Sequence, residues 1–290
     1  YHHGFGNRVW LECNPKEDSL MPIHKDGTTF FWKRRTVSQQ RTRFFSFLVI
    51  LVIFLISSSY IGRQTMWEFV SDAPVQIRDF VSRMFPPDVK YFGRIMPALW
   101  DTITISVFGT GIAVVISFLL AIMAAKNTTP NSAIRMVVLT IIVASRSVNS
   151  MIWALLIVQI VGPGLLASII AIAIRSLGMI SKLMYEAIEE INKEPIEAIT
   201  ATGATKAQVF VYGYLPQLMP SFVGTSVYRW ENNIRESTII GIVGGGGIGM
   251  LLNSSINRLA WDQVMSILIV IFFTVVVAEW VSAKIRKSIS

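Results

Sequence analysis

The sequence predicts an all-α integral membrane protein with about six transmembrane helices. Only 15% of the 290 residues are charged and 52% are hydrophobic, whereas a soluble domain carries roughly 25% charged residues. The apolar residues are collected in uncharged runs, and a helix of about 20 such residues crosses the hydrocarbon core of a bilayer. Lys and Arg are concentrated in alternate segments between these runs, as they are in the cytoplasmic loops of membrane proteins.

The N-terminal part of the chain falls into two predicted units. Residues 1–43 are polar and basic, and we expect them to form a disordered cytoplasmic segment. Residues 44–98 begin with an uncharged run, 44–62, which we interpret as the first transmembrane helix. The mixed residues 63–97 predict an amphipathic interfacial helix outside the cytoplasm, followed by a proline turn.

The remaining spans are expected within residues 99–287, which we treat as one core unit. Its uncharged or nearly uncharged runs are residues 102–125, 136–160, 165–180, 215–234 and 262–283. An apolar, glycine-rich stretch follows the run at 215–234 and belongs to none of the predicted spans. A core of five spans remains the alternative, if residues 44–62 only flank it.

Small residues on the second predicted span are spaced for close helix packing. Gly109, Ala113 and Ser117 follow one another at four-residue intervals, so they share one helix face. Small side chains let two helix backbones approach closely in lipid. The alternative is that these are ordinary small residues of a membrane helix.

The distribution of basic residues predicts that both chain termini are cytoplasmic. With an even number of spans, the cytoplasmic segments contain the basic residues before the first span, Lys126, Arg135, residues 182–214 and the basic C-terminal end. The basic residues outside are nearly balanced by acidic ones. The net charge of +8 is thus spread over loops and forms no compact basic module, which argues against nucleic-acid binding.

No catalytic or cofactor-binding constellation is evident in the sequence. The single cysteine, Cys13, can form no internal disulfide. The run Gly244-x-Gly246-x-x-Gly249 formally matches a dinucleotide fingerprint, but no strand precedes it, so we interpret these glycines as sites of bending or close backbone packing. A phosphate-binding P-loop motif is also missing. We therefore expect no cofactor or metal, and an energy source in another subunit or in an ion gradient.

The segment 186–216 has the pattern of a compact helical knob on the cytoplasmic side. Pro195 suits the first turn of a helix, where its missing N–H has no partner to lose. Apolar residues then recur at helical spacing as far as Phe210, with Gly203 as a break between two short helices. We expect a docking surface for another protein here, and an ordinary loop on the lipid headgroups is the alternative.

This segment resembles the EAA loop of ABC-importer permeases. The residues in register with that motif are Glu197, Ala198, Gly203, Leu215 and Pro216. Ile199 and Gly213 depart from it, which leaves the helix–glycine–helix layout in place. Further motifs narrow the resemblance to permeases of phosphonate importers over residues 85–287. They lie at residues 85–88, 178–182, 212–217, 228–235 and 244–249.

The resemblance implies a type I, MetI-like ABC-importer permease fold in a bacterial cytoplasmic (inner) membrane. It implies a channel-forming homodimer, two ATP-binding cassette ATPase subunits docked on the EAA-loop residues, and an extracytoplasmic phosphonate-binding protein. The chain itself would be no enzyme, since ATP would be hydrolysed in the partner subunits. The motion of the docked ATPases would reach the spans through Glu197 and the turn at Gly203.

Arginine residues inside the predicted spans point to the substrate. A charged side chain at bilayer depth faces a pore or a partner. Arg146 lies about 16 Å along a helix from Arg135, which places it near mid-membrane. Arg175 is expected at a similar depth. Guanidinium donors match the oxygens of a phosphonate or phosphate. The predicted substrate path contains Arg146, Asn149, Arg229, Glu231 and Arg235. The alternative is that the arginines form structural ion pairs with glutamates. Those available are Glu231, Glu236 and Glu279.

Three rival functions remain open at this point. The same fold could import phosphite, a phosphate ester or another small oxyanion. A gradient-driven carrier would need no ATPase, but the internal repeats that favour such a carrier are not found in the sequence. A non-transporting membrane scaffold would leave the arginines at mid-membrane without a role.

Overall fold

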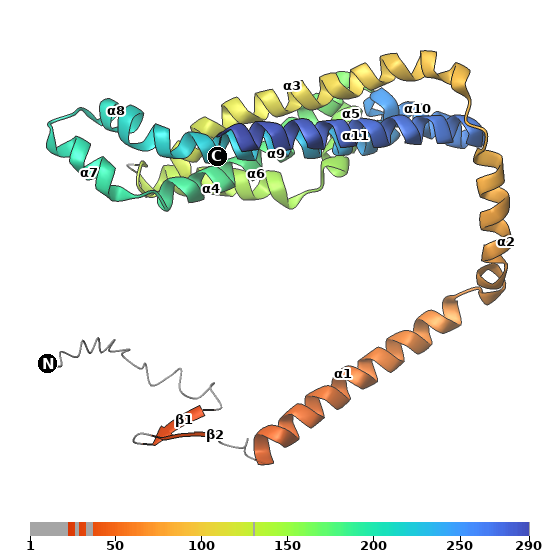
Figure 1. Ribbon diagram of the computed structural model, residues 1–290, viewed down its shortest axis with the longest axis horizontal. Helices are drawn as coiled ribbons and strands as arrows, with labels where there is room; N and C mark the ends of the chain where they lie inside the picture. The colour runs from red at the N-terminus through yellow and green to blue at the C-terminus, as the bar shows by residue number, and fades with distance from the viewer. Residues whose placement is uncertain (1–22, 27–28, 33–36, 130, 290) are drawn as a thin grey trace, which may run out of the picture. The chain divides into compact units, whose positions relative to one another are not determined.

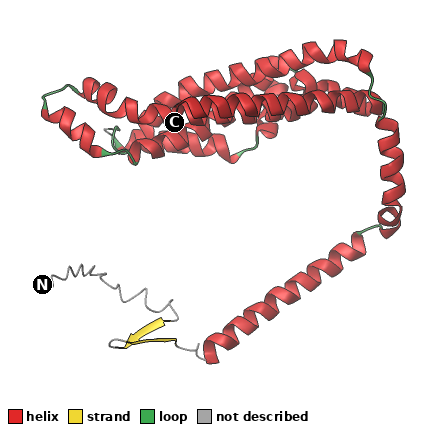
Figure 2. Ribbon diagram, in the orientation of Figure 1, coloured by secondary structure: helices red, strands yellow, loops and turns green. Residues whose placement is uncertain are grey.

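A computed structural model describes residues 23–26, 29–32, 37–129 and 131–289, and helices account for most of them (Figure 1, Figure 2). The chain divides into two compact units, Tyr1–Pro74 and Val75–Ser290. Within the described residues, 4 helices are long and apolar enough to cross a membrane, and there are up to 6 spans if each of 2 bent helix pairs counts as one. The prediction of about six spans agrees with this range.

Residues 1–43, which we expected to be disordered, contain a short hairpin in the part that the structure describes. Strands β1 (Ile23–Asp26) and β2 (Thr29–Trp32) pair in antiparallel fashion. Aromatic and β-branched residues favour strands, but strands this short leave too brief a pattern to be recognised in a sequence. The prediction for residues 1–22 lies outside the described residues.

Helix α1 (Val37–Gln64) contains the first predicted span. None of the residues in its apolar, membrane-spanning part is buried within this chain, as expected for a helix that faces lipid or another chain. α1 begins at Val37 rather than at residue 44. The extra turns contain Gln and Arg residues, which are good helix formers with side chains long enough to reach the headgroups.

Helix α2 (Trp67–Met84) has the amphipathic character predicted for residues 63–97, and a single turn of 3-10 helix, η1 (Val89–Tyr91), follows it. The boundary between the two units falls within α2. The reason is that the second half of α2 already packs on the core. The ring of Phe80 contacts that of Trp261 edge-on, with 4.6 Å between the ring centroids.

Long helices form the centre of the second unit. They are α3 (Phe92–Ala124), α6 (Leu165–Glu189), α9 (Leu215–Ile240) and α11 (Trp261–Ile289). α3 lies along α6, and α9 packs against both of them and against α11 (Figure 1). Gly109, Ala113 and Ser117 are all buried, as their spacing predicts. A Cβ atom on Gly109 would lie 2.8 Å from Cγ2 of Ile172, so the close approach of α3 to α6 depends on this glycine.

The predicted span 136–160 corresponds to a bent pair of helices, which passes as one span only when both are counted together. Helices α4 (Ser132–Ser147) and α5 (Ser150–Val161) meet at 95°. Val148 between them is extended, with φ −99° and ψ 139°. Asn149 is the N-cap of α5, where its Oδ1 accepts a hydrogen bond from a backbone N–H at 3.0 Å. A short polar side chain inside an apolar run therefore starts a new helix at mid-span.

A glycine-rich turn joins α9 to α10 (Gly247–Asn257), and the helices on its two sides are bent by 58°. Gly244 and Gly246 have φ of 95° and 82°, which residues with a side chain rarely adopt. A Cβ atom on Gly249 would lie 2.9 Å from Cα of Gly241. The interpretation of this run as a site of bending and close backbone packing is confirmed.

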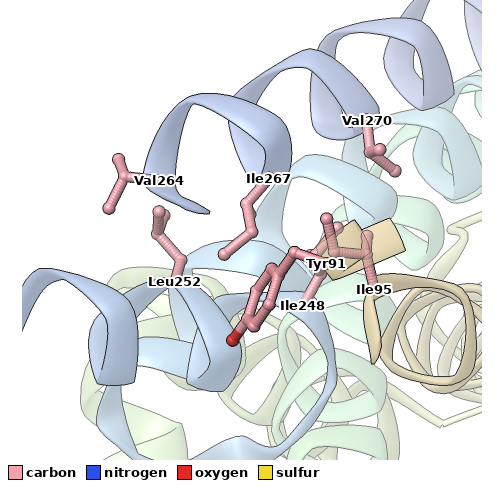
Figure 3. Close-up of a cluster of buried hydrophobic side chains, with 7 residues drawn as sticks. All are labelled: Tyr91, Ile95, Ile248, Leu252, Val264, Ile267 and Val270. Carbon is pink, nitrogen blue, oxygen red and sulfur yellow. The ribbon is translucent and has the colours of Figure 1, made fainter. Parts of the chain in front are cut away.

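Helix α10 is held between α3 and α11 by a hydrophobic cluster. Figure 3 shows its 7 buried side chains, which are Tyr91, Ile95, Ile248, Leu252, Val264, Ile267 and Val270. Thr102 Oγ1 accepts a hydrogen bond from Ile248 N at 2.8 Å, which satisfies a backbone donor in the first turn of α10. The turn after α9 is thus fixed to α3 at its far end.

Candidate functional site

A group of polar side chains from α3, α6 and α9 meets inside the bundle. We call it the mid-span cluster, and its members are Thr110, Arg175, Ser176, Arg229, Asn233 and Glu236. Polar groups away from water are costly unless they find hydrogen-bond partners. The geometry of the cluster shows how most of these donors and acceptors are satisfied.

The neutral members of the cluster form a buried network. Asn233 Nδ2 donates to Thr110 Oγ1 at 2.7 Å and to Ser176 Oγ at 2.9 Å. Arg229 Nε also donates to Ser176 Oγ, at 3.0 Å. Because the partners belong to three different helices, the network fixes the rotation of α9 against α3 and α6.

The charged members of the cluster are two cations and one carboxylate. Glu236 Oε1 accepts from Arg229 Nη2 at 3.0 Å and from Arg175 Nε at 3.3 Å. The side chain of Arg229 is 8% exposed, that of Glu236 is 18% exposed and that of Arg175 is 29% exposed. The exposed edge of the cluster is therefore positive, and Arg175 forms it.

Arg146 lies at the depth of the mid-span cluster but outside it. A Cβ atom on Gly178 of α6 would lie 3.1 Å from the backbone N of Arg146, and Arg175 Nη1 donates to the carbonyl of Val148 at 3.4 Å. These contacts place Arg146 beside Gly178, in the middle of α6. Gly178 lies about 20 Å along that helix from Leu165. Arg146 and Arg175 therefore lie at a similar level along α6. The Arg146 side chain is exposed and has no hydrogen bond or ion pair within the described residues.

Asn149, the next residue of the predicted path, does not lie on the same helix as Arg146. The chain leaves the helical conformation at Val148, so Arg146 belongs to the end of α4 and Asn149 to the cap of α5. Both side chains are exposed. Trp153 Nε1 donates to the carbonyl of Ser145 at 3.2 Å and satisfies one of the carbonyls that the break frees.

Glu231 and Arg235 form a separate ion pair on α9. Glu231 Oε1 lies 2.6 Å from Arg235 Nη2, and its Oε2 lies 3.6 Å from Nη1 of Arg286 on α11. Glu231 is buried, whereas both arginines are partly exposed. A buried carboxylate therefore holds two accessible cations and ties α9 to α11.

Arg175 and Glu236 are absent from the predicted path residues, although Glu236 contacts one of them, Arg229, and Arg175 contacts Glu236. Part of the signal was available in the sequence. Arg229, Asn233 and Glu236 recur at intervals of four and three residues, so they share one face of a helix. Nothing in the sequence identifies Arg175, on another helix, as the second partner of Glu236.

The segment predicted as a helical knob has the expected helix–glycine–helix layout. Helix α7 (Lys193–Ala201) ends before Gly203, which has φ 80°, and α8 (Lys206–Val209) follows. Asn192 caps α7, and Thr205 caps α8 through a reciprocal capping box. Each short helix thus begins at its own capping residue, which makes the segment a defined structure and not a loose loop.

The inner side of α7 packs against the turn of π-helix η2 (Phe210–Tyr214) that leads into α9. A Cβ atom on the buried Gly213 would lie 3.4 Å from Cγ1 of Ile196 and 3.6 Å from Cδ1 of Ile199. The two departures from the motif therefore lie close together in space, since a Cβ atom at position 213 would be in ordinary van der Waals contact with Ile199. Among the motif residues, Leu215 is half-buried and the others are exposed. The exposed ones are Glu197, Ala198, Gly203 and Pro216.

Comparison with known proteins assigns a family to this arrangement. Residues 117–287 match the model of the binding-protein-dependent transport system inner membrane component. The phosphite transport system permease protein PtxC of Stutzerimonas stutzeri is 36% identical over 82% of this chain and 86% of its own length. The putative cryptic phosphonate transport system permease protein PhnE2 of Escherichia coli K12 is 41% identical over 41% of this chain and 97% of its own length.

A solved structure shows the same fold. A chain of the MetNI methionine ABC transporter in an inward-facing conformation superimposes with a TM-score of 0.60 at 21% identity, over 70% of this chain and 99% of that one. The family match includes the α7–α8 segment and all of the mid-span cluster on α6 and α9. The chain therefore belongs to the family of binding-protein-dependent transport system inner membrane components and is a permease subunit of an ABC importer.

Proposed function

We propose that this permease imports a phosphonate along a path that passes Arg146 and the exposed edge of the mid-span cluster. The observation that carries the proposal is a surplus of positive charge at mid-depth. Arg146 has no partner within the described residues, and Arg175 and Arg229 share one carboxylate. A cation at that depth needs a partner or a pore. A passing oxyanion supplies the missing negative charge.

The names of the relatives support a phosphorus oxyanion as the cargo. The E. coli relative is named for phosphonate and the S. stutzeri relative for phosphite. Phosphite is the second candidate, because the relative named for it matches most of this chain. Both ions present tetrahedrally arranged oxygens, which a guanidinium group binds through two parallel hydrogen bonds.

The other predicted path residues have distinct roles in this proposal. Asn149 presents a polar side chain on the far side of the break from Arg146. Arg235 is a further accessible cation, held in place by Glu231. Arg229 is too buried to touch the substrate in this conformation, and it supports the path by holding Glu236.

Replacing Arg146 by glutamine is expected to reduce phosphonate uptake roughly tenfold or more, because a charge-assisted hydrogen bond contributes about 1.5–3 kcal/mol. The folded protein should be unaffected, since the side chain is exposed and has no partner within the described residues. Uptake of radiolabelled methylphosphonate into cells that contain the whole transporter measures this. Arg94→Gln removes an exposed arginine from the start of α3 and should leave uptake unchanged. Normal uptake by Arg146→Gln contradicts the proposed path.

The energy for transport comes, in this proposal, from two ATPase subunits that dock on the α7–α8 segment of a permease homodimer. Its exposed residues Glu197, Ala198 and Gly203 form the contact, and the half-buried Leu215 with Pro216 passes the movement to α9. An extracytoplasmic phosphonate-binding protein delivers the substrate, and both chain termini are cytoplasmic. What supports the docking role is that a short, capped and exposed element stands at the end of a long span.

Replacing Gly203 by proline is expected to abolish the stimulation of ATPase activity by substrate, because proline cannot adopt a φ of 80° and the turn between α7 and α8 must change. Gly203→Asn is the matched control, since asparagine tolerates a left-handed backbone, and it should retain most of the activity. Glu197→Lys tests the contact itself through charge reversal on an exposed side chain. ATPase activity of the purified complex is the readout. Unchanged stimulation in both Gly203→Pro and Glu197→Lys would falsify the coupling role.

A further inference from the structure

Glu236 binds both of its arginine partners through only one of its two carboxylate oxygens. Its Oε1 accepts from both Arg229 and Arg175, whereas its Oε2 is buried without a hydrogen-bond partner in the part of the chain that the structure describes. A carboxylate that only braced two guanidinium groups would use both oxygens, as bidentate pairs do. A buried oxygen without a partner forgoes a hydrogen bond. The contact is therefore one that another anion can replace.

Arg175 is the member of the cluster that an entering anion reaches first. It is the most exposed of the three charged side chains. Its contacts are long, 3.3 Å from Nε to Glu236 and 3.4 Å from Nη1 to the carbonyl of Val148. Its remaining donors have no partner among the described residues. Arg146 lies two residues before Val148, so both arginines belong to the region of the break between α4 and α5.

We propose that Glu236 is a resident competitor of the substrate and sets the affinity of the path. A phosphonate or phosphite that enters between Arg146 and Arg175 takes over the Arg175 donor that Glu236 holds. Glu236 then remains on Arg229 alone. This inference rests on the proposed function, because it assumes that the oxyanion passes Arg175.

The competition solves a problem that an arginine-lined path creates. Arg146 and Arg175, with the positive charge of the buried Arg229 behind them, would hold an anion strongly, because charges at this depth are weakly screened. A transport site must release what it binds. The Glu236 carboxylate lowers the net charge and must be displaced before the substrate can bind, and it returns when the substrate leaves. The affinity of the path for the substrate is thereby reduced, while the guanidinium donors that select an oxyanion all remain in place.

Glu236→Gln tests this proposal in the full chain, purified and reconstituted in lipid nanodiscs. Glutamine has the same shape and no charge, so phosphite should bind roughly tenfold or more tightly, as measured by phosphorus NMR titration. Uptake by the whole transporter should fall, because release becomes slow. Glu236→Asp keeps the charge and should bind phosphite as weakly as the wild type. Unchanged or weaker binding in Glu236→Gln overturns the proposal.

Glu189→Gln is the matched control, because it removes a partly buried carboxylate that serves two other cations, Lys126 and Arg135, away from the proposed path. An equal gain in affinity in this variant would show a general effect of charge and would contradict a displacement of Glu236. If Glu236→Gln does not fold, the wild type decides the question. Infrared difference spectra of the wild-type chain with isotope-labelled glutamate should show a shifted carboxylate band when phosphite is added. Glu236→Asp should lack this shift, and its absence in the wild type overturns the proposal.

The outcome also separates this inference from the function on which it rests. Uptake of phosphite and methylphosphonate by the wild-type transporter is measured in parallel. If uptake occurs but Glu236→Gln gains no affinity, only the role of Glu236 is contradicted. If neither ion is taken up, the proposed cargo is contradicted.

Discussion

Replacement of Gly249 by alanine is expected to prevent the chain from reaching its folded state. The added Cβ would overlap the carbonyl oxygen of Thr238 and lie 2.9 Å from Cα of Gly241. Both obstacles are backbone atoms, which cannot turn away as the end of a side chain can. Overpacking of a core ordinarily costs about 1–3 kcal/mol, and we expect a cost of about 3 kcal/mol or more here.

The yield of folded protein in detergent and its thermal unfolding measure this effect. Gly224→Ala is the matched control, because it adds the same methyl group to α9 at a position where nothing lies within 4 Å of the new atom. This variant should be as stable as the wild type or slightly more stable, since alanine favours helices more than glycine does. A Gly249→Ala protein with wild-type yield and melting temperature would show that the turn can move, contrary to the packing described above.

Arg229→Gln is expected to destabilise the protein by about 3 kcal/mol, because removal of one partner leaves a buried charge with less compensation. Arg229 holds Glu236 and also donates to Ser176, so two contacts of the mid-span cluster are affected together. Arg146→Gln should change the free energy of unfolding by less than about 0.5 kcal/mol, as exposed substitutions usually do. The same chemical change should therefore separate a structural arginine from a path arginine.

A double-mutant cycle tests whether the ion pair is the cause. The double variant Arg229→Gln with Glu236→Gln should lose less stability than the sum of the two single variants, because neither charge is then left without the other. Denaturant titrations in mixed micelles give the free energies. Strict additivity of the two losses would mean that Arg229 and Glu236 do not stabilise each other, and the ion pair at 3.0 Å would then have no energetic role.

The uncharged runs predict the long helices well because lipid allows little else. An apolar run that crosses a bilayer must satisfy its own backbone, so α3, α6 and α11 follow from composition. The break at Val148 could not be predicted in the same way. The run around it is apolar on both sides, and the freed carbonyls are satisfied by Trp153 and Arg175, which only the tertiary structure brings there. Asn149 was the one local sign, as a capping residue within a span.

The mid-span cluster was predictable only in part, for a related reason. Charge at mid-depth is visible in a sequence, and so is the common helix face of Arg229 and Glu236. Which glutamate meets which arginine depends on how the helices are rotated against each other. Arg175 pairs with Glu236 because α6 and α9 are locked together by Ser176 and Asn233. The α7–α8 segment needed no such information, since its caps and its glycine are local signals.

The bend between α4 and α5 gives this span a hinge. A continuous helix would tilt as one rod, so that widening the pathway at one membrane face would narrow it at the other. The break at Val148 divides the run into two rods at 95°, and Arg175 and Trp153 each donate a hydrogen bond to a carbonyl at this break. The pivot thus coincides with the level at which the arginines stand. In the proposed path, access from the two faces would alternate around the level of these arginines.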